Sequence, residues 1–128
     1  MKTAALILSS LLAGGTLVAE EGSARSLMSK DLTGVPGREV SMIFVEYPPG
    51  ASSPVHAHHA QALVYVLEGS IVMQVRGGAP VTLAPGQTWY EGPDDVHVVS
   101  RNASNSAPAR YLVFLVKDKG APILVPAK

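Results

Sequence analysis

From position 39 onward, short runs rich in β-branched and aromatic residues alternate with segments that contain glycine or proline. Three of these runs are EVSMIFVEY, ALVYVLEG and YLVFLVK, and the segments between runs include PPGASSP and RGGAP. Short runs separated by such turns are typical of β-sandwiches and β-barrels. After Lys30 no window keeps the 3.6-residue apolar period of a helix. The sequence therefore predicts an all-β fold.

The apolar pattern differs among the expected strands. In residues 70–75 the side chains of Ile71, Met73 and Val75 share one face, which predicts a half-buried strand. Residues 111–116 are apolar on both faces, which predicts a strand that is covered on both sides. Residues 117–128 contain two prolines and are expected to form a terminal arm outside the central strands.

The N-terminal residues have the pattern of a signal peptide. Lys2 precedes an apolar segment at 4–12, and small residues follow before Glu20. The apolar segment is too short for a membrane-spanning helix, and a short N-terminal helix is the alternative interpretation. We therefore expect a signal peptide at 1–19, a lead-in at 20–38 with irregular structure, a single β-barrel domain at 39–128, and a secreted or periplasmic protein.

Charge and cysteine content narrow the range of partners. The 128 residues include ten basic and ten acidic side chains, so the formal net charge is zero. A neutral chain has no field that would attract nucleic acid or an anionic membrane surface, and a small-molecule ligand or substrate is the expected partner. The chain has no cysteine, which excludes a disulfide framework, a zinc ribbon and a thiol nucleophile.

Three of the four histidines fall within residues 56–59, HAHH. His56 and His58 point to the same face of an extended chain and can bind one ion together, whereas His59 points to the other face. His97 lies in another expected strand and could supply a third imidazole. Imidazole is a common ligand of first-row transition metals. The alternative is that the spacing arises by chance and that His97 is an ordinary half-buried residue.

Further polar side chains near these histidines have less specific interpretations. Gln61 could add an amide oxygen as a fourth metal ligand, or it could lie in the pocket beside the metal. Glu91 and Arg76 are expected to be solvated charges.

Residues 50–69, GASSPVHAHHAQALVYVLEG, resemble the first motif of the cupin superfamily, in which Gly, HxH, Glu and Gly follow in order. Four positions are in register: Gly50, His56, His58 and Gly69. The position of the family's glutamate, seven residues before the last glycine, is occupied by Ala62. The chain therefore lacks, at this position, the carboxylate that many cupins use as a metal ligand.

Residues 86–102, GQTWYEGPDDVHVVSRN, resemble the second cupin motif. The separation from Gly86 to His97 is that of the family. The positions between and after them are shifted: Gly92 stands in the proline position, Pro93 comes one residue late, Asp94 takes the inner glycine position, and Asn102 lies one residue beyond the usual asparagine. These shifts alter the turn before His97.

The resemblance implies a double-stranded β-helix, the cupin-type jelly-roll barrel, with a divalent metal (Fe, Mn, Ni, Cu or Zn) in its mouth, and it implies a homodimer. The expected ligands are His56, His58, His97 and Gln61. Some cupin dioxygenases, such as cysteine dioxygenase, use three histidines. Two functions stay open, a dioxygenase-type oxygenase of a small organic substrate and a binder of a metal or small ligand without turnover. A sugar-nucleotide or sugar isomerase is disfavoured, because no basic cluster is available to bind phosphate or carboxylate.

Overall fold

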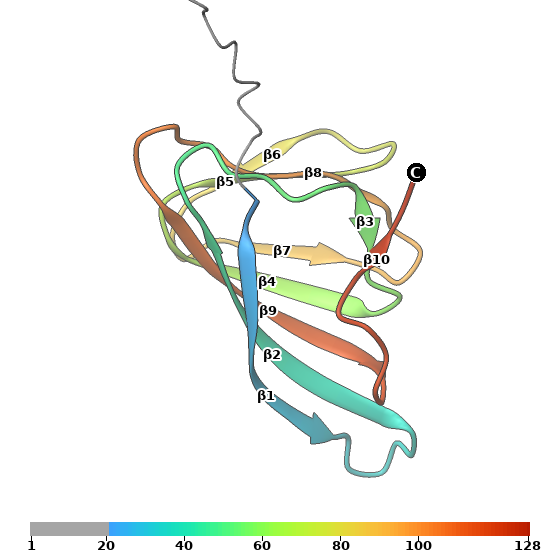
Figure 1. Cartoon of the computed structure of the whole chain (residues 1–128). Coiled ribbons are helices and arrows are strands. Elements are labelled where there is room, and N and C mark those ends of the chain that lie inside the picture. Colours follow the sequence, from blue (N-terminus) through green and yellow to red (C-terminus); the bar gives the residue numbers. More distant parts are fainter. Residues whose placement is uncertain (1–20) are drawn as a thin grey trace, which may run out of the picture.

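Ten strands make up the regular structure of residues 21–128, the part of the chain that the computed structural model describes (Figure 1). They form two five-stranded sheets, every strand pair within them is antiparallel, and residues 21–128 contain no helix. The expected all-β double-stranded β-helix is therefore confirmed. Within these residues there is accordingly no helix that could cross a membrane.

The first sheet contains the long strands of the molecule. In order across the sheet these are β1 (Ser23–Asp31), β2 (Arg38–Tyr47), β9 (Ala109–Asp118), β4 (Gln61–Glu68) and β7 (Thr88–Glu91). Burial alternates along β2, β4 and β9, as the period of two predicts. One face of this sheet therefore lines the core and the other faces outward.

The second sheet contains shorter strands and lies opposite the first (Figure 1). In order these are β10 (Val125–Pro126), β3 (His56–Ala57), β8 (His97–Asn102), β5 (Ile71–Val75) and β6 (Val81–Leu83). The core between the sheets includes the fully buried side chains of Ile43, Val66, Ile71, Met73 and Leu115. Burying these side chains stabilises the sandwich by about 1.5–3 kcal/mol for each large apolar residue.

A tight turn connects β4 to β5. Gly69 adopts a positive φ of 70° there, and because β4 and β5 lie in different sheets, this turn carries the chain from one sheet to the other and does not close a hairpin. A side chain could not be accommodated, because a Cβ atom at this position would lie 2.4 Å from the carbonyl oxygen of Pro108.

Three sequence expectations about strands have different outcomes. The lead-in is not irregular, because residues 23–31 form β1, which pairs with β2 at the sheet edge although all its residues are exposed. Residues 117 and 118 of the expected terminal arm extend β9, and beyond them the arm contributes only β10, at an edge, as its prolines predict. Strand β9 is covered on one side only, because Leu112, Phe114 and Val116 remain half-exposed. The expected signal peptide, 1–19, lies outside the described residues.

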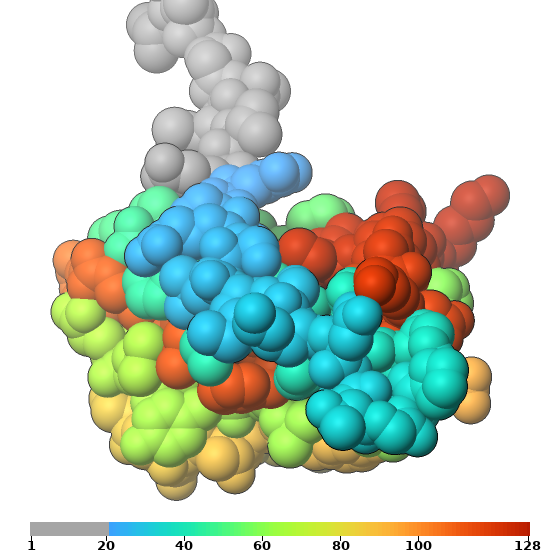
Figure 2. Space-filling view, turned by 90° about the horizontal axis from the view of Figure 1, so that it is seen from below, coloured from blue at the N-terminus to red at the C-terminus, as the bar shows by residue number. Residues whose placement is uncertain are grey.

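Segments close to the two ends of the described chain lie on the same side of the molecule. Figure 2 shows the N-terminal segment, in blue, next to the C-terminal residues, in red. Both segments border the same internal cavity, through residues 21–24 at one end and through Ile123 and Leu124 at the other.

Candidate metal centre

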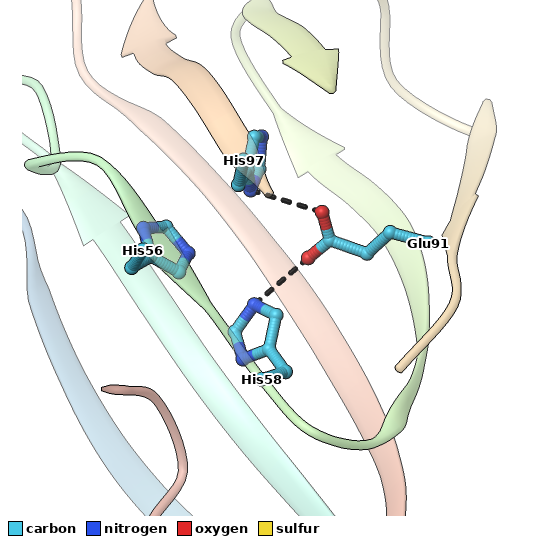
Figure 3. A group of neighbouring side chains, drawn as sticks. All are labelled: His56, His58, Glu91 and His97. Carbon is cyan, nitrogen blue, oxygen red and sulfur yellow. Dashed lines mark ion pairs between the residues drawn. The ribbon is translucent and has the colours of Figure 1, made fainter. Parts of the chain in front are cut away.

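Strands β3 and β8 bring histidines from the two motifs together. His56 and His97 are directly opposite each other in the antiparallel pair, with ring centroids 5.0 Å apart. His58 follows β3 on the same side, and its ring centroid lies 4.9 Å from that of His56. Figure 3 shows the three rings facing a common point. The structure therefore places together the three imidazoles that the sequence singled out.

A carboxylate, that of Glu91, joins the three histidines (Figure 3). Its oxygens lie 2.8 Å from Nε2 of His58 and 3.1 Å from Nδ1 of His97. One potential ligand atom from each of the four side chains lies within 4.8 Å of all the others. Glu91 is only 2% exposed, so the expectation that it is a solvated charge is wrong. Its strand ends at the site, and its side chain points inward.

The position of Glu91 in the sheet explains how the site gains a carboxylate without a glutamate in the first motif. Glu91 in β7 is the direct cross-strand partner of Ala62 in β4, the residue at the family's glutamate position. Cβ atoms of directly opposed residues are about 4.5–5.5 Å apart. A glutamate on the neighbouring strand therefore reaches the space that a glutamate at position 62 would occupy.

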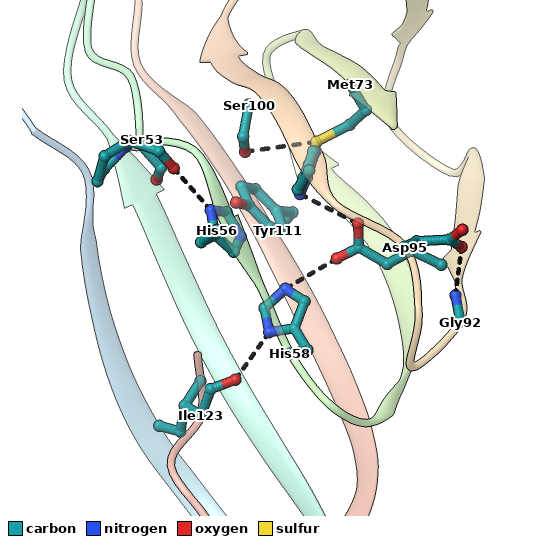
Figure 4. Close-up of polar contacts among 12 residues, drawn as sticks. Ser53, His56, His58, Met73, Gly92, Asp95, Ser100, Tyr111 and Ile123 are labelled. Atoms are coloured by element: carbon teal, nitrogen blue, oxygen red, sulfur yellow. Dashed lines mark hydrogen bonds and ion pairs between the residues drawn. The ribbon is translucent and has the colours of Figure 1, made fainter. Parts of the chain in front are cut away.

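Backbone carbonyls fix the orientation of two of the imidazoles (Figure 4). Nδ1 of His56 lies 2.8 Å from the carbonyl oxygen of Pro54, and Nδ1 of His58 lies 2.7 Å from that of Ile123. A carbonyl oxygen can only accept a hydrogen bond, so each Nδ1 carries a proton and donates it. In a neutral ring this leaves the Nε2 lone pair free, which is the arrangement usual for histidines that bind a metal.

The third histidine has unsatisfied polar atoms. Both ring nitrogens of His97 are buried and have no hydrogen-bond partner among residues 21–128, and the same holds for Oε2 of Glu91. Nδ1 of His97 and Oε2 of Glu91 are close enough for an ion pair but are not aligned for a hydrogen bond. Buried polar groups are normally paired. A cation among these atoms would satisfy them, and three imidazoles with one carboxylate suit a divalent transition metal.

In the metal-free protein, the charges of the four side chains compensate one another. Burial acts to raise the pKa of Glu91, but its hydrogen bond with His58 and the nearby His97 outweigh burial and lower that pKa to about 2. Burial acts to lower the pKa of His58, but its bonds with Glu91 and with the Ile123 carbonyl raise it overall. The pKa of His56 is lowered, mainly by burial. The carboxylate thus favours a proton on His58.

Gln61 and His59 lie away from this cluster. Gln61 is exposed at the start of β4, next to the buried Ala62, and does not line the cavity beside the histidines. The structure therefore does not place its amide with the three imidazoles. His59 is also exposed and has a φ of 48°, in the left-handed region. Its ring does not join those of the other three histidines, as expected, although it lies in a bend after the end of β3 and not in an extended strand.

The cupin domain family model matches residues 43–115, which is more than half of the chain and includes all four side chains of the cluster. The chain is a cupin. The resemblance of its two motifs is thereby confirmed. No curated protein matches this cupin significantly.

Solved structures confirm the fold of this cupin. The DMSP lyase DddQ from Ruegeria pomeroyi DSS-3 is 22% identical with a TM-score of 0.67, over 84% of this chain and 52% of that one. A cupin domain from Bordetella pertussis Tohama I is 15% identical with a TM-score of 0.63, over 80% and 99%. A recombinant oxalate oxidase in complex with glycolate is 22% identical with a TM-score of 0.65, over 89% and 59%. This cupin thus spans about half the length of the lyase.

A cavity of about 240 Å³ adjoins the four side chains. Its walls are largely apolar and include Ile43, Val45, Val64, Met73, Val113 and Ile123. Hydroxyl groups form a second polar cluster in the same cavity, through the side chains of Tyr47, Ser53, Ser100 and Tyr111. Figure 4 shows part of this cluster beside the histidines. The cavity thus has largely apolar walls and two polar clusters, the three histidines with Glu91 and the hydroxyl groups.

The N-terminal segment contacts the hydroxyl cluster through Gly22. A Cβ atom at this position would lie 1.9 Å from the ring of Tyr47. The ring of Tyr47 therefore lies directly against the backbone of residue 22, and the segment that precedes β1 shapes the wall of the cavity.

Proposed function

We propose that this cupin binds one divalent transition metal ion through His56, His58, His97 and Glu91, and that it acts on a small organic substrate in the adjoining cavity. The observation that carries the proposal is the convergence of the four ligand atoms within 4.8 Å, together with buried nitrogens of His97 that have no hydrogen-bond partner in the described part of the chain. Fe, Mn, Ni, Cu and Zn are all compatible with imidazole ligands, and carboxylates bind them as well.

The protein residues have defined tasks in this proposal. The carbonyls of Pro54 and Ile123 hold the rings of His56 and His58 with Nε2 toward the ion. Glu91 neutralises one of the two positive charges of the ion. The apolar walls exclude water from the site, which strengthens electrostatic interactions inside it. The metal, when bound, supplies Lewis-acid chemistry that polarises an oxygen of the substrate.

For the reaction we propose an oxygenase of the dioxygenase type. His56, His58, His97 and Glu91 would hold the metal, and a divalent ion with these four ligands could also bind a substrate and dioxygen. The similar folds of an oxalate oxidase and a DMSP lyase support small oxygen-containing molecules as substrates and leave the reaction open. A binder that holds the metal or a small ligand without turnover is the second candidate, since the site is complete without any further catalytic group.

Elemental analysis of purified protein tests the metal site. We expect about one metal ion per chain in the parent, loss of the ion in His58→Ala, and retention in His59→Ala, which removes the exposed neighbouring histidine. Equal metal content in the two variants would contradict the proposed ligands. Dioxygen uptake with a panel of phenols and thiols then separates the two candidate functions, because the binder consumes no dioxygen with any of the native metals.

We also propose that this cupin forms a homodimer and is exported. The outward face of the first sheet supports the dimer, because it carries exposed large apolar side chains: Leu63, Tyr65, Leu67 and Tyr90.

Export rests on the sequence pattern of residues 1–19. Expression with and without these residues, followed by cell fractionation, tests it: the full chain should reach the periplasm or medium, and equal distribution of both forms would contradict export.

A further inference from the structure

We infer that the substrate of this cupin has an apolar body and carries at most one negative charge, located on the oxygen that meets the metal. This inference rests on the proposed function. Three features of the cavity carry it: the charges that line it, its apolar walls, and a hydroxyl group whose present hydrogen bond is weak. Together they define which oxygen compounds the cavity can take.

The charges of the cavity favour a ligand with a single negative charge. Among the described residues that line it, none is lysine or arginine, and the carboxylates are Glu91 in the site and Glu21 at the edge. A divalent ion with Glu91 and three neutral imidazoles has a net charge of one. One anionic oxygen neutralises this charge, whereas a second anionic group would be buried without a cation. Burying an unpaired charge is strongly unfavourable.

The walls and the size of the cavity indicate the body of the substrate. Side chains of Val64, Met73 and Val113 face the cavity beside the metal ligands, and apolar atoms there gain from contact with an apolar ligand. The volume of about 240 Å³ is below the range of about 300–1,000 Å³ that is usual for drug-sized ligands. A short aliphatic chain or a single ring therefore fits better than a large molecule.

The hydroxyl cluster provides one hydrogen bond to the substrate. Ser100, which is 4% exposed, donates its proton to the sulfur of Met73 at 3.5 Å and accepts a hydrogen bond from the Tyr47 hydroxyl at 2.7 Å. A thioether is a weak acceptor. A neutral oxygen of the substrate is a better partner for this donor. The cavity thus takes one anionic oxygen at the metal and tolerates a neutral oxygen near Ser100.

Three carboxylates of known charge and length test the inference. Protein loaded with Co²⁺ is titrated at pH 7 with acetate, hexanoate and adipate, and the visible absorption of the cobalt reports binding. Hexanoate and adipate have the same number of carbons, but adipate carries a second carboxylate in place of the terminal methyl group. We expect hexanoate to bind at least tenfold more tightly than either of the other two. Adipate binding as tightly as hexanoate would overturn the charge limit, and equal binding of acetate would overturn the apolar body.

Two matched variants test whether the charges that line the cavity cause the weaker binding of adipate. Ser23→Lys places a cation at the edge of the cavity, and Thr82→Lys places the same charge on β6, outside the cavity; both positions are exposed. We expect Ser23→Lys to strengthen adipate binding about threefold, as one screened charge pair would, and Thr82→Lys to leave it unchanged. Equal effects of the two variants would overturn the assignment of the charge limit to this cavity.

The same experiment separates this inference from the proposed function. If Co²⁺ does not bind stoichiometrically, or if His58→Ala binds it as well as the parent does, the metal site fails and the inference fails with it. If Co²⁺ binds as proposed but the three carboxylates bind alike, only the substrate class is overturned.

Discussion

Replacement of Glu91 by glutamine should destabilise the metal-free protein by about 3 kcal/mol near pH 6. The pKa of Glu91 is lowered from 4.5 to about 2 by partners that outweigh its burial. One pKa unit corresponds to about 1.4 kcal/mol, so the ionised carboxylate contributes about 3 kcal/mol above pH 4.5. Glutamine keeps the shape of the side chain but leaves the charge of His58 without its partner.

The pH dependence of this loss identifies its cause. Because the pKa of Glu91 is lowered, its contribution is present above pH 4.5 and disappears as the pH falls toward 2. Because the pKa of His58 is raised, the contribution of its charge is present below 6.5 and disappears as the pH rises through the raised pKa. The difference between parent and Glu91→Gln should therefore be largest at about pH 5–6.

Urea unfolding of chelator-treated protein, followed across this pH range, measures the effect. Glu21→Gln removes an exposed carboxylate that has no ion pair among the described residues, and it should change the free energy of unfolding by less than about 0.5 kcal/mol. A loss below about 1 kcal/mol in Glu91→Gln at pH 6, or a loss that does not change with pH, would refute the reasoning.

Three further predictions concern the metal and the assembly. Glu91→Ala should lower metal affinity at least about tenfold in competition titrations. Adding Ala62→Glu to this variant should restore part of the affinity. If the double variant binds metal no better than Glu91→Ala, a glutamate on β4 cannot take the place of the one on β7. Metal binding at pH 6 should release about one proton, from His58, when calorimetry is compared in two buffers, and release of none would contradict a protonated ring. Light scattering should show that the parent is a dimer and that Leu63→Lys is a monomer. The control Val81→Lys, on the other sheet, should remain a dimer. A monomeric parent would exclude the dimer.

The fold was predictable from the sequence because its signals are local. Alternating apolar residues and glycine turns define strands one at a time, and Gly69 marks the turn after β4 without reference to the pairing of the strands. The histidine cluster was predictable for a related reason: the parity of His56 and His58 is a property of a single extended segment. Only His97 needed a second motif to associate it with them.

Glu91 could not be found in the same way, because its role depends on the register between two strands that are far apart in the sequence. Its own segment, TWYE, gives no sign that the carboxylate is buried. The pairing of Glu91 with Ala62 becomes visible only when β4 and β7 are aligned. Gln61 was predicted as a ligand because it lies near the histidines in sequence. Its side chain, however, is on the opposite face of β4 from Ala62. A missing carboxylate in one motif is thus a reason to inspect the residues directly across the sheet.

The hydrogen bond from His58 to the carbonyl of Ile123 has a practical consequence for work with this protein. The last residues of the chain also run beside His56, through the pairing of β10 with β3. A shortened C-terminus, or an affinity tag that pulls on it, would disturb the rings of two ligands at once. Preparations meant for metal analysis should therefore keep residues 123–128 intact and carry no tag directly after them.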